Sequence, residues 1–149
     1  MTDLERLDPP AAAAALRATP DGARGFLGVD PVTQNDMAIA GELTRLGAHV
    51  FRRGQALLGF VPNSEQPRQA TVATTSADPD LMTEFLTFLG SYQRCTSYVA
   101  MVPSGSAAES TFNGCGFHRT GTLRGHRYQT GQYQDVHVYF ATVGDLCRS

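Results

Sequence analysis

Apolar positions in the first two thirds of the chain predict three helices. An alanine-rich segment starts at Ala11, after Pro9 and Pro10, and is typical of a short helix that ends at a turn over residues 20–22. Residues 32–47 place apolar side chains mostly on one helical face, with Gly47 as the stop. Residues 81–94 follow helical spacing most closely, through Leu81, Met82, Phe85, Leu86, Leu89 and Tyr92.

Between and after these helices the pattern changes to that of strands. Residues 48–62 predict two strands joined by a polar turn at 52–55, and residues 68–76 predict a third. The apolar run 98–103 is typical of a buried strand, and a small-residue helix is expected over 104–114. Two long β segments around Thr130 and Gly131 close the chain. This order predicts one mixed α/β domain spanning residues 1–149.

Composition narrows the class of protein. The 149 residues are 42% hydrophobic and 17% charged, which is ordinary for a globular domain. A net charge of −2 without a block of Lys or Arg argues against a nucleic-acid partner. No apolar run reaches the length of a membrane-spanning helix, and the first residues are acidic where a signal peptide would be basic. We therefore expect a cytoplasmic protein with no membrane partner.

The three cysteines, Cys95, Cys115 and Cys147, lie far apart, so their spacing predicts neither a disulfide framework nor a zinc site. Buried thiols without chemistry are the favoured interpretation. No pair of His, Cys, Asp or Glu residues has the spacing of metal ligands, and no metal site is expected.

Residues 104–117, with the paired alanines 107 and 108 and the closing Gly116-Phe117, resemble the last-helix segment of the GNAT superfamily of N-acyltransferases. The following residues resemble the closing hairpin of its ribosomal-protein and small-amine acetyltransferases. Ten positions match in uninterrupted register: Gly116, Phe117, Gly121, Leu123, Arg124, His126, Tyr128, Gly131, Tyr133 and Asp135.

The resemblance is strongest over residues 104–141 and weak or absent over 1–44. In the predicted strand pair, Gly59 stands where the family commonly has a glycine. The resemblance implies a GNAT-like α/β fold, in which a mixed sheet with central splayed parallel strands is flanked by helices.

A member of this family holds acyl-CoA in the gap between the splayed strands. The strand before the long helix pairs with the pantetheine arm, and the helix N-terminus takes the pyrophosphate through free N–H groups. Carried over to this chain, the resemblance implies acetyl-CoA or another acyl-CoA as cofactor. The positions that would contact it are Val72, Thr74, Thr75, Ser76, Gly105 and Phe112.

The phosphate motif of the family, Gln/Arg-x-x-Gly-x-Gly/Ala, is not kept. Its three defined positions fall on Ala77, Asp80 and Met82, and Asp78 adds a second carboxylate. Taken alone, Asp78-Pro79-Asp80 is an ordinary capped helix start. Two negative charges beside a pyrophosphate would repel it, so we predict weakened or non-standard use of acyl-CoA.

Proton-handling residues also depart from the family. The tyrosine that commonly protonates the leaving thiolate is replaced by Phe112, and the asparagine of the same segment by Gly105. The catalytic candidates are therefore sought on the closing hairpin, which borders the acceptor side in this fold.

The hairpin supplies His126, Tyr128, Tyr133 and Asp135 as candidates. His126 could act as a base, because histidine titrates near neutral pH. Asp135 could orient an acceptor amine or tie down the hairpin turn, and the structural role is modestly favoured. His137, Arg124 and Arg127 are secondary candidates, the arginines for an anionic acceptor.

Three functions stay open. The first is an acyltransferase-like enzyme that acts on a small molecule and uses acyl-CoA weakly, or takes its acyl group from a donor such as an acyl-carrier protein. The second is other chemistry in a small-molecule biosynthetic pathway. The third is a non-catalytic ligand-binding or interaction protein. A homodimer is expected by analogy with the superfamily alone.

Overall fold

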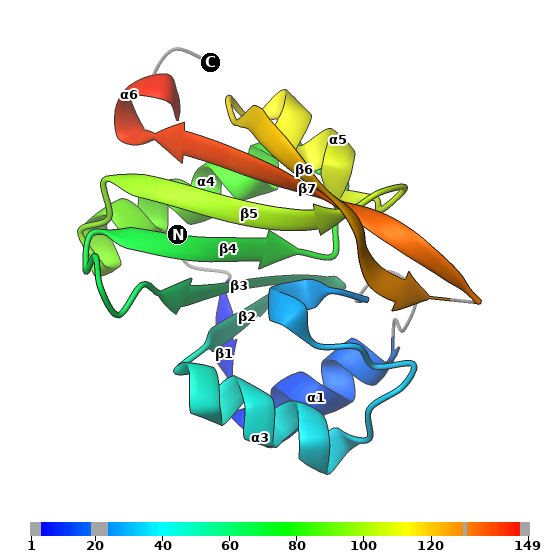
Figure 1. Cartoon of the computed structure of the whole chain (residues 1–149). Coiled ribbons are helices and arrows are strands. Elements are labelled where there is room, and N and C mark those ends of the chain that lie inside the picture. The colour runs from blue at the N-terminus through cyan, green and yellow to red at the C-terminus, as the bar shows by residue number, and fades with distance from the viewer. Residues whose placement is uncertain (1–3, 19–23, 130, 147–149) are drawn as a thin grey trace.

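The computed structural model describes residues 4–18, 24–129 and 131–146, which form one seven-stranded sheet flanked by helices (Figure 1). The sheet order is β1-β2-β3-β4-β5-β7-β6. The strands are β1 (Glu5–Leu7), β2 (His49–Arg53), β3 (Ala56–Pro62), β4 (Gln69–Thr74), β5 (Ser97–Pro103), β6 (His118–Gln129) and β7 (Gln132–Thr142). The helices are α1 (Pro9–Ala18), the 3-10 turn η1 (Phe26–Gly28), α3 (Asp36–Leu46), α4 (Pro79–Tyr92), α5 (Ala108–Gly114) and α6 (Val143–Leu146).

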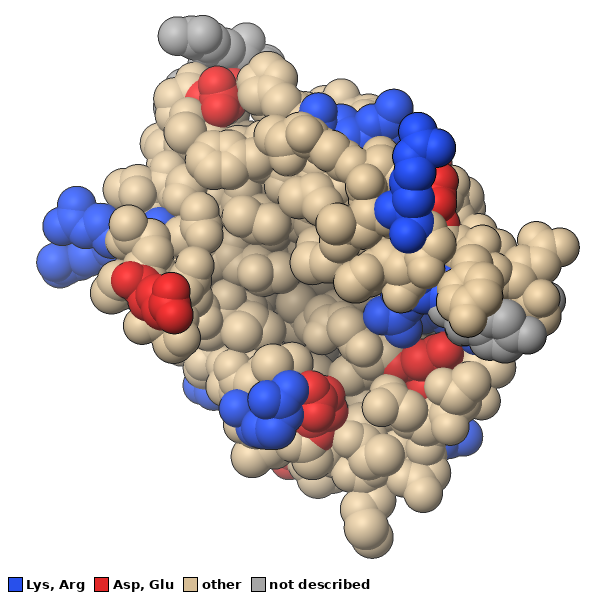
Figure 2. All heavy atoms as spheres, viewed as in Figure 1, with Lys and Arg blue, Asp and Glu red and all other residues tan. Residues whose placement is uncertain are grey.

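The parallel pair β4 and β5 lies at the centre of the sheet, and all other neighbouring strands are antiparallel. Its register joins residues 69–71 to residues 97–99 and goes no further, although β4 continues to Thr74 and β5 to Pro103. The two strands therefore separate at their carboxyl ends. This confirms the predicted mixed sheet with splayed central parallel strands. The face of the molecule seen in Figure 2 is hollowed near its middle, where the surface is uncharged.

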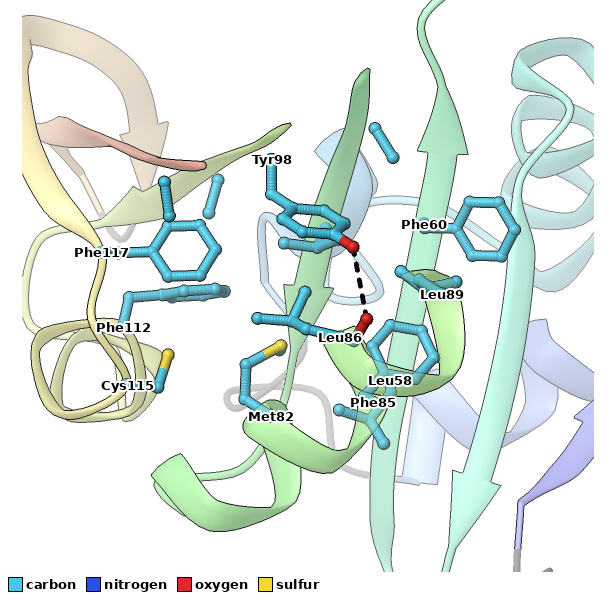
Figure 3. Packing of buried hydrophobic residues seen from close by; sticks show 14 of the residues in the cluster. Leu58, Phe60, Met82, Phe85, Leu86, Leu89, Tyr98, Phe112, Cys115 and Phe117 are labelled. Carbon is cyan, nitrogen blue, oxygen red and sulfur yellow. Dashed lines mark hydrogen bonds between the residues drawn. The ribbon is translucent and has the colours of Figure 1, made fainter. Parts of the chain in front are cut away.

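Alternation along β3 divides the interior into two cores. Leu58 and Phe60 face α4 and α5, whereas Leu57 faces α1 and α3. Figure 3 shows the first core, in which the apolar side of α4 meets the aromatic rings of β3, β5 and α5. The hydroxyl of Tyr98 is buried there and donates to the carbonyl of Leu86 at 3.2 Å, so its polar atom is satisfied.

Element boundaries differ from the predicted ones for local reasons. The helix predicted over 32–47 begins at Asp36, because the Asn35 side chain accepts from Ala38 N at 2.8 Å and caps it. The helix predicted over 104–114 begins at Ala108, because Gly105 has a φ of 83°. The apolar pattern of the third helix starts at residue 81, and α4 begins at Pro79 with Asp78 as its cap, which confirms the capped start predicted from Asp78-Pro79-Asp80.

Three of the described elements were not predicted. Strand β1 pairs antiparallel with β2, and its three residues are too short to give a period-2 signal. The turn η1 lies between the first two predicted helices, and the four-residue helix α6 follows the last strand; no element was predicted at either place. The predicted turn at residues 20–22 and Thr130 of the hairpin turn lie outside the described residues. No helix in the described part of the chain is both long and apolar enough to cross a bilayer.

Replacing Gly59 by alanine should destabilise the fold. A Cβ on Gly59 would lie 2.9 Å from both Leu27 Cδ1 and Phe26 Cζ, so these two buried side chains would have to shift. Overpacking of this kind costs about 1–3 kcal/mol. We expect Gly59→Ala to lower the free energy of unfolding by that amount in urea titrations. Gly121→Ala is the matched control, because a Cβ on this strand glycine meets nothing within 4 Å. Equal effects of the two substitutions would contradict the proposed packing.

Acid should destabilise the protein in part through His49. Its ring stacks on Phe60 at a centroid distance of 4.8 Å, and its Nδ1 accepts from Arg6 at 2.9 Å. Partial burial, followed by the nearby Arg6 charge, lowers the pKa of His49. The unfolded chain therefore binds this proton more readily, and stability should fall as the pH drops below about 6.5. Urea unfolding at pH 8 and pH 5 should show a smaller loss for His49→Gln than for the wild type. An equal loss would contradict this assignment.

Candidate functional site

A pocket of about 250 Å³ opens where β4 and β5 separate. Its floor is the carboxyl half of the two strands, and its walls are the segment 24–30, the end of α3 and the hairpin β6–β7. Most lining groups are apolar. The lining residues are Gly25, Leu27, Gly28, Leu46, Val61, Thr71, Val72, Ala73, Met101, Pro103, His126, Arg127 and Val136. The splay thus provides a cavity for a small molecule with a largely apolar body.

The segment 24–30 closes one side of this pocket in an uncommon backbone conformation. Gly25 and Gly28 have φ values of 82° and 87°, and Leu27, which carries a side chain, has a φ of 50°. Left-handed backbone at a leucine is unfavourable and persists only where contacts fix it. Leu27 is 9% exposed and packs against Gly59, which supplies those contacts. A Cβ on Gly25 would lie 2.6 Å from Pro103 Cγ, so the segment also touches the end of β5.

A nearly buried ion pair fastens the same segment. Arg24 Nη2 lies 3.2 Å from Asp30 Oδ2, and the two side chains are 10% and 11% exposed. Asp30 Oδ1 also accepts from Val32 N at 3.0 Å. Burial alone would raise the pKa of Asp30, but the hydrogen bonds from Val32 and Arg24 outweigh it, and the pKa is lowered. Asp30 is therefore ionised at neutral pH, and the segment carries a matched pair of buried charges.

The hairpin brings His126 and Arg127 to the pocket by an irregularity in β6. The β6–β7 register shifts between Leu123 and Arg127, with Gly125 at a φ of 55°. Asp135 Oδ1 accepts from Gly125 N at 2.9 Å, and the carbonyl oxygen of Asp135 accepts from Ser104 N at 2.9 Å. Through these two hydrogen bonds, Asp135 connects the hairpin to the loop between β5 and α5. Asp135 does not line the pocket, and its side chain bonds to the residue before His126.

Two other hairpin candidates, Tyr133 and His137, lie apart from the pocket. Tyr133 is 72% exposed and is not among the lining residues. His137 lies 3.1 Å from Glu109 of α5 through Nε2 and 3.0 Å from Thr122 Oγ1 through Nδ1, away from the lining. The backbone of Tyr128 pairs with that of Tyr133, and its side chain lies outside the described part of the structure. The structure thus brings His126 to the pocket and leaves Tyr133 outside it.

The residues expected to contact a cofactor form the floor of the gap and the loop that follows. Val72 lines the pocket, and Thr74 is 6% exposed, with its Oγ1 accepting from Ser76 N at 3.1 Å. The side chain of Thr75 instead bonds to β3, since its Oγ1 accepts from Leu57 N at 3.1 Å. The loop between β4 and α4 is thus fastened by bonds within the chain.

The N-terminus of α4 is capped by its own carboxylate. Asp78 Oδ1 accepts from Asp80 N at 3.0 Å and from Leu81 N at 3.2 Å, and Asp78 N donates to Ser76 Oγ at 3.1 Å. These are N–H groups of the kind that a helix offers to a phosphate. The neighbouring groove holds three carboxylates, from Asp78, Asp80 and Glu84, and one arginine, Arg53, which pairs with Glu84. This surface is acidic.

Phe112 is buried where the family commonly has a tyrosine. It is 1% exposed, with its ring centroid 4.9 Å from that of Phe117 and 5.9 Å from that of Tyr139. Figure 3 shows Phe112 and Phe117 side by side. Gly105 forms the turn that enters α5. Neither residue offers a side-chain proton, so any proton transfer here falls to other groups.

The thiols are not activated. Burial raises the pKa of Cys95 and raises that of Cys115 to about 11, so both stay protonated at neutral pH. Cys147 lies outside the described residues. Among those residues, no group of three or more His, Cys, Asp or Glu is placed to hold a metal ion.

Sequence patterns missed the segment 24–30, which forms a wall of the site. Its glycines at 25 and 28 were a signal of irregular backbone, but glycine-rich chain is typical of any loop. Nothing in the spacing of Arg24 and Asp30 indicated that they would be buried together beside β5.

The chain is similar in fold to solved structures of N-acetyltransferases. No protein-family model matches the sequence, and no curated protein matches it. Spermidine N-acetyltransferase from Vibrio cholerae, in complex with CoA and spermine, is 13% identical with a TM-score of 0.71, over 99% of each chain. Ribosomal-protein-alanine N-acetyltransferase from Brucella melitensis is 15% identical with a TM-score of 0.62, over 94% of this chain and 99% of that one. The chain therefore has the fold of the GNAT acetyltransferases.

Proposed function

We propose that this protein is an N-acyltransferase that moves an acyl group from a thioester to a small acceptor bound in the pocket at the splay of β4 and β5. The observation that carries the proposal is the pocket itself, which opens where the strand pairing stops after Thr71 and Val99. By resemblance, a thioester lies in that gap in this fold, so an acceptor in the pocket would lie beside it.

The chemistry needs a base for the attacking amine, and His126 is the candidate. It lines the pocket from the β6 irregularity and is solvent-exposed, so a proton taken from the acceptor can pass to water. As the amine nitrogen forms its bond to the thioester carbonyl carbon, the nitrogen loses a proton and the carbon–sulfur bond breaks. The leaving sulfur takes its proton from water or from a group other than Phe112, which has none to give.

The carboxylates at the N-terminus of α4 favour an acyl donor that places no pyrophosphate there. Asp78 already accepts from two of the N–H groups at the helix start, and Asp80 adds a charge beside them. A pantetheine thioester carried on an acyl-carrier protein lacks the nucleotide and its pyrophosphate. It would use the strand gap without meeting the two aspartates.

Phe112 favours a second candidate, a ligand-binding protein that has kept the pocket and lost the transfer reaction. Its buried ring fills the place of the usual acid and provides no hydroxyl. Other chemistry on a small molecule of a biosynthetic pathway would use the same pocket. An assay that supplies both an acyl donor and an acceptor distinguishes the transferase from these other candidates.

Acetyl-CoA and S-acetylpantetheine, titrated by calorimetry, test the choice of donor. We expect acetyl-CoA to bind no more tightly than S-acetylpantetheine, because the nucleotide arm gains nothing at α4. Unit charges 5 Å apart repel by about 0.8 kcal/mol in water and by about 3 kcal/mol at an effective dielectric of about 20. Removing both charges in Asp78→Asn/Asp80→Asn should therefore tighten acetyl-CoA by about tenfold or more, while asparagine keeps the cap. The affinity for S-acetylpantetheine should not change.

Asp36→Asn is the matched control, since Asp36 lies in the first turn of α3 and far from the β4–α4 loop in sequence. Tight binding of acetyl-CoA by the wild type, well beyond that of S-acetylpantetheine, would contradict weakened use of acyl-CoA.

The role of His126 is tested by single-turnover acyl transfer. We expect His126→Asn to slow transfer by about 10²- to 10⁴-fold, the usual contribution of a general base. Tyr133→Phe serves as the comparison on the same hairpin, and its rate should stay within about twofold because Tyr133 lies outside the pocket. Unchanged transfer in His126→Asn would remove His126 from the mechanism. No transfer by the wild type with either donor would leave the ligand-binding candidate.

A further inference from the structure

A small recess continues the pocket past the end of β4. It shares Gly25, Val72, Ala73, Met101 and Pro103 with the pocket, so the two cavities meet along these five residues. Beyond them the recess is bounded by Arg24, Phe26, Thr74, Val102, Ser106, Ala108 and Phe112. Its volume of about 20 Å³ accommodates one atom of water size.

Arg24, which lines the recess, carries an N–H group for which the described residues provide no partner. Arg24 has a side chain only 10% exposed, and one of its nitrogens, Nη2, reaches Asp30. Its Nε is fully buried and has no hydrogen-bond partner within the described residues. A buried donor of a charged group rarely stays unpaired in a native protein. An oxygen atom of a ligand in the recess would satisfy it.

The charges around both cavities favour an anion. None of the described residues that line the pocket or the recess is acidic, whereas Arg24, Arg127 and His126 are among them. Arg127 reaches the segment that carries Arg24, since a Cβ on Gly25 would lie 4.0 Å from Arg127 Cζ. Asp30 pairs with Arg24 and does not line either cavity, and Arg127 adds a second positive charge to the lining of the pocket. A ligand that carries a carboxylate would meet this charge favourably.

The apolar lining of the pocket indicates what the uncharged part of the ligand is. Leu27, Val61, Met101 and Val136 present apolar surface to the space that leads into the recess. Met101 is 41% exposed on β5, which is uncommon for a central strand and leaves its side chain available to a ligand. An aliphatic or aromatic group of modest size would cover this surface.

We infer that the pocket and its recess bind an apolar carboxylate, whose anionic oxygen enters the recess and accepts from Arg24 Nε while its apolar body fills the pocket. If the protein is the proposed acyltransferase, the acceptor amine belongs to a molecule that also bears a carboxylate, such as a hydrophobic amino acid. This consequence rests on the proposed function. A polyamine is disfavoured because its cations would face two arginines with no carboxylate in the lining.

Binding of two small probes tests the inference without any acyl donor. 4-Methylpentanoate and 4-methylpentanamide have nearly the same shape and differ in charge. Calorimetric titration of the full chain should show the carboxylate binding at least tenfold more tightly than the amide. Spermidine should bind more weakly than the carboxylate. Equal affinity for the acid and the amide, or tighter binding of spermidine, would overturn the inference.

Two variants assign the preference to Arg24. Arg24→Gln should reduce the ratio of carboxylate to amide affinity to within about twofold. Because this change leaves Asp30 buried without a charge partner, the double variant Arg24→Gln/Asp30→Asn is measured beside it and should show the same ratio. Arg68→Gln, an exposed arginine before β4 that lines neither cavity, is the control and should keep the wild-type ratio. A double variant that folds and keeps the preference would overturn the role of Arg24.

The outcomes also separate this inference from the proposed function. Carboxylate preference without acyl transfer to L-leucine from either donor would refute the transferase and leave the carboxylate site in place. Transfer that proceeds as fast to L-leucinamide as to L-leucine would support the transferase and refute the acceptor class.

Discussion

The parting of β4 from β5 is the constraint on which the rest of this structure depends. Parallel strands normally pair along their whole common length, but here the pairing stops after three residues on each strand. Beyond that point the backbone groups that face the gap need other partners, and the space between the strands must be filled by side chains, water or a ligand. The pocket, its recess and the segment 24–30 are all consequences of this gap.

The segment 24–30 shows how the fold covers the gap without closing it. Its two left-handed glycines and left-handed Leu27 let the chain turn sharply between Gly59 on β3 and Pro103 on β5. There is no room for a Cβ on Gly59 beside Leu27, or on Gly25 beside Pro103. These close contacts hold the strained leucine in place. The Arg24–Asp30 pair then fixes the direction in which a buried cation faces. Because breaking a buried pair is costly, this cation stays in position for a ligand.

The two ends of the gap have opposite electrostatic character. Beside the recess, arginines and a histidine gather with no acidic residue in the lining. At the start of α4, the protein's own Asp78 occupies the hydrogen-bond donors, and Asp80 and Glu84 surround it. A helix N-terminus attracts anions through its free N–H groups and its dipole, and a side-chain carboxylate meets that demand as well as a phosphate does. We therefore expect an anion from outside to bind at the recess and to be repelled at α4.

Sequence by itself determined the mixed α/β class, the order of the main elements and the family of folds. Period-2 and helical spacing are local properties, and the closing hairpin kept ten positions in register, from Gly116 to Asp135. The capped start of α4 was also predictable, because Asp78 and Pro79 act on backbone atoms within three residues. Helix starts at Asp36 and Ala108 were placed several residues too early, since side-chain caps and a left-handed glycine carry little hydrophobic signal.

Only the tertiary structure decided which candidates share a site. It placed His126 in the lining of the pocket and Tyr133 outside it. His126 lies within the register shift of β6, and no sequence pattern reports a bulge. It gave Asp135 its contact with Gly125, across the hairpin. It also buried Arg24 beside Phe112, a residue 88 positions away in the sequence, through contacts that close a long loop. Spacing along a chain encodes local geometry, whereas the meeting of distant segments depends on how the whole core packs.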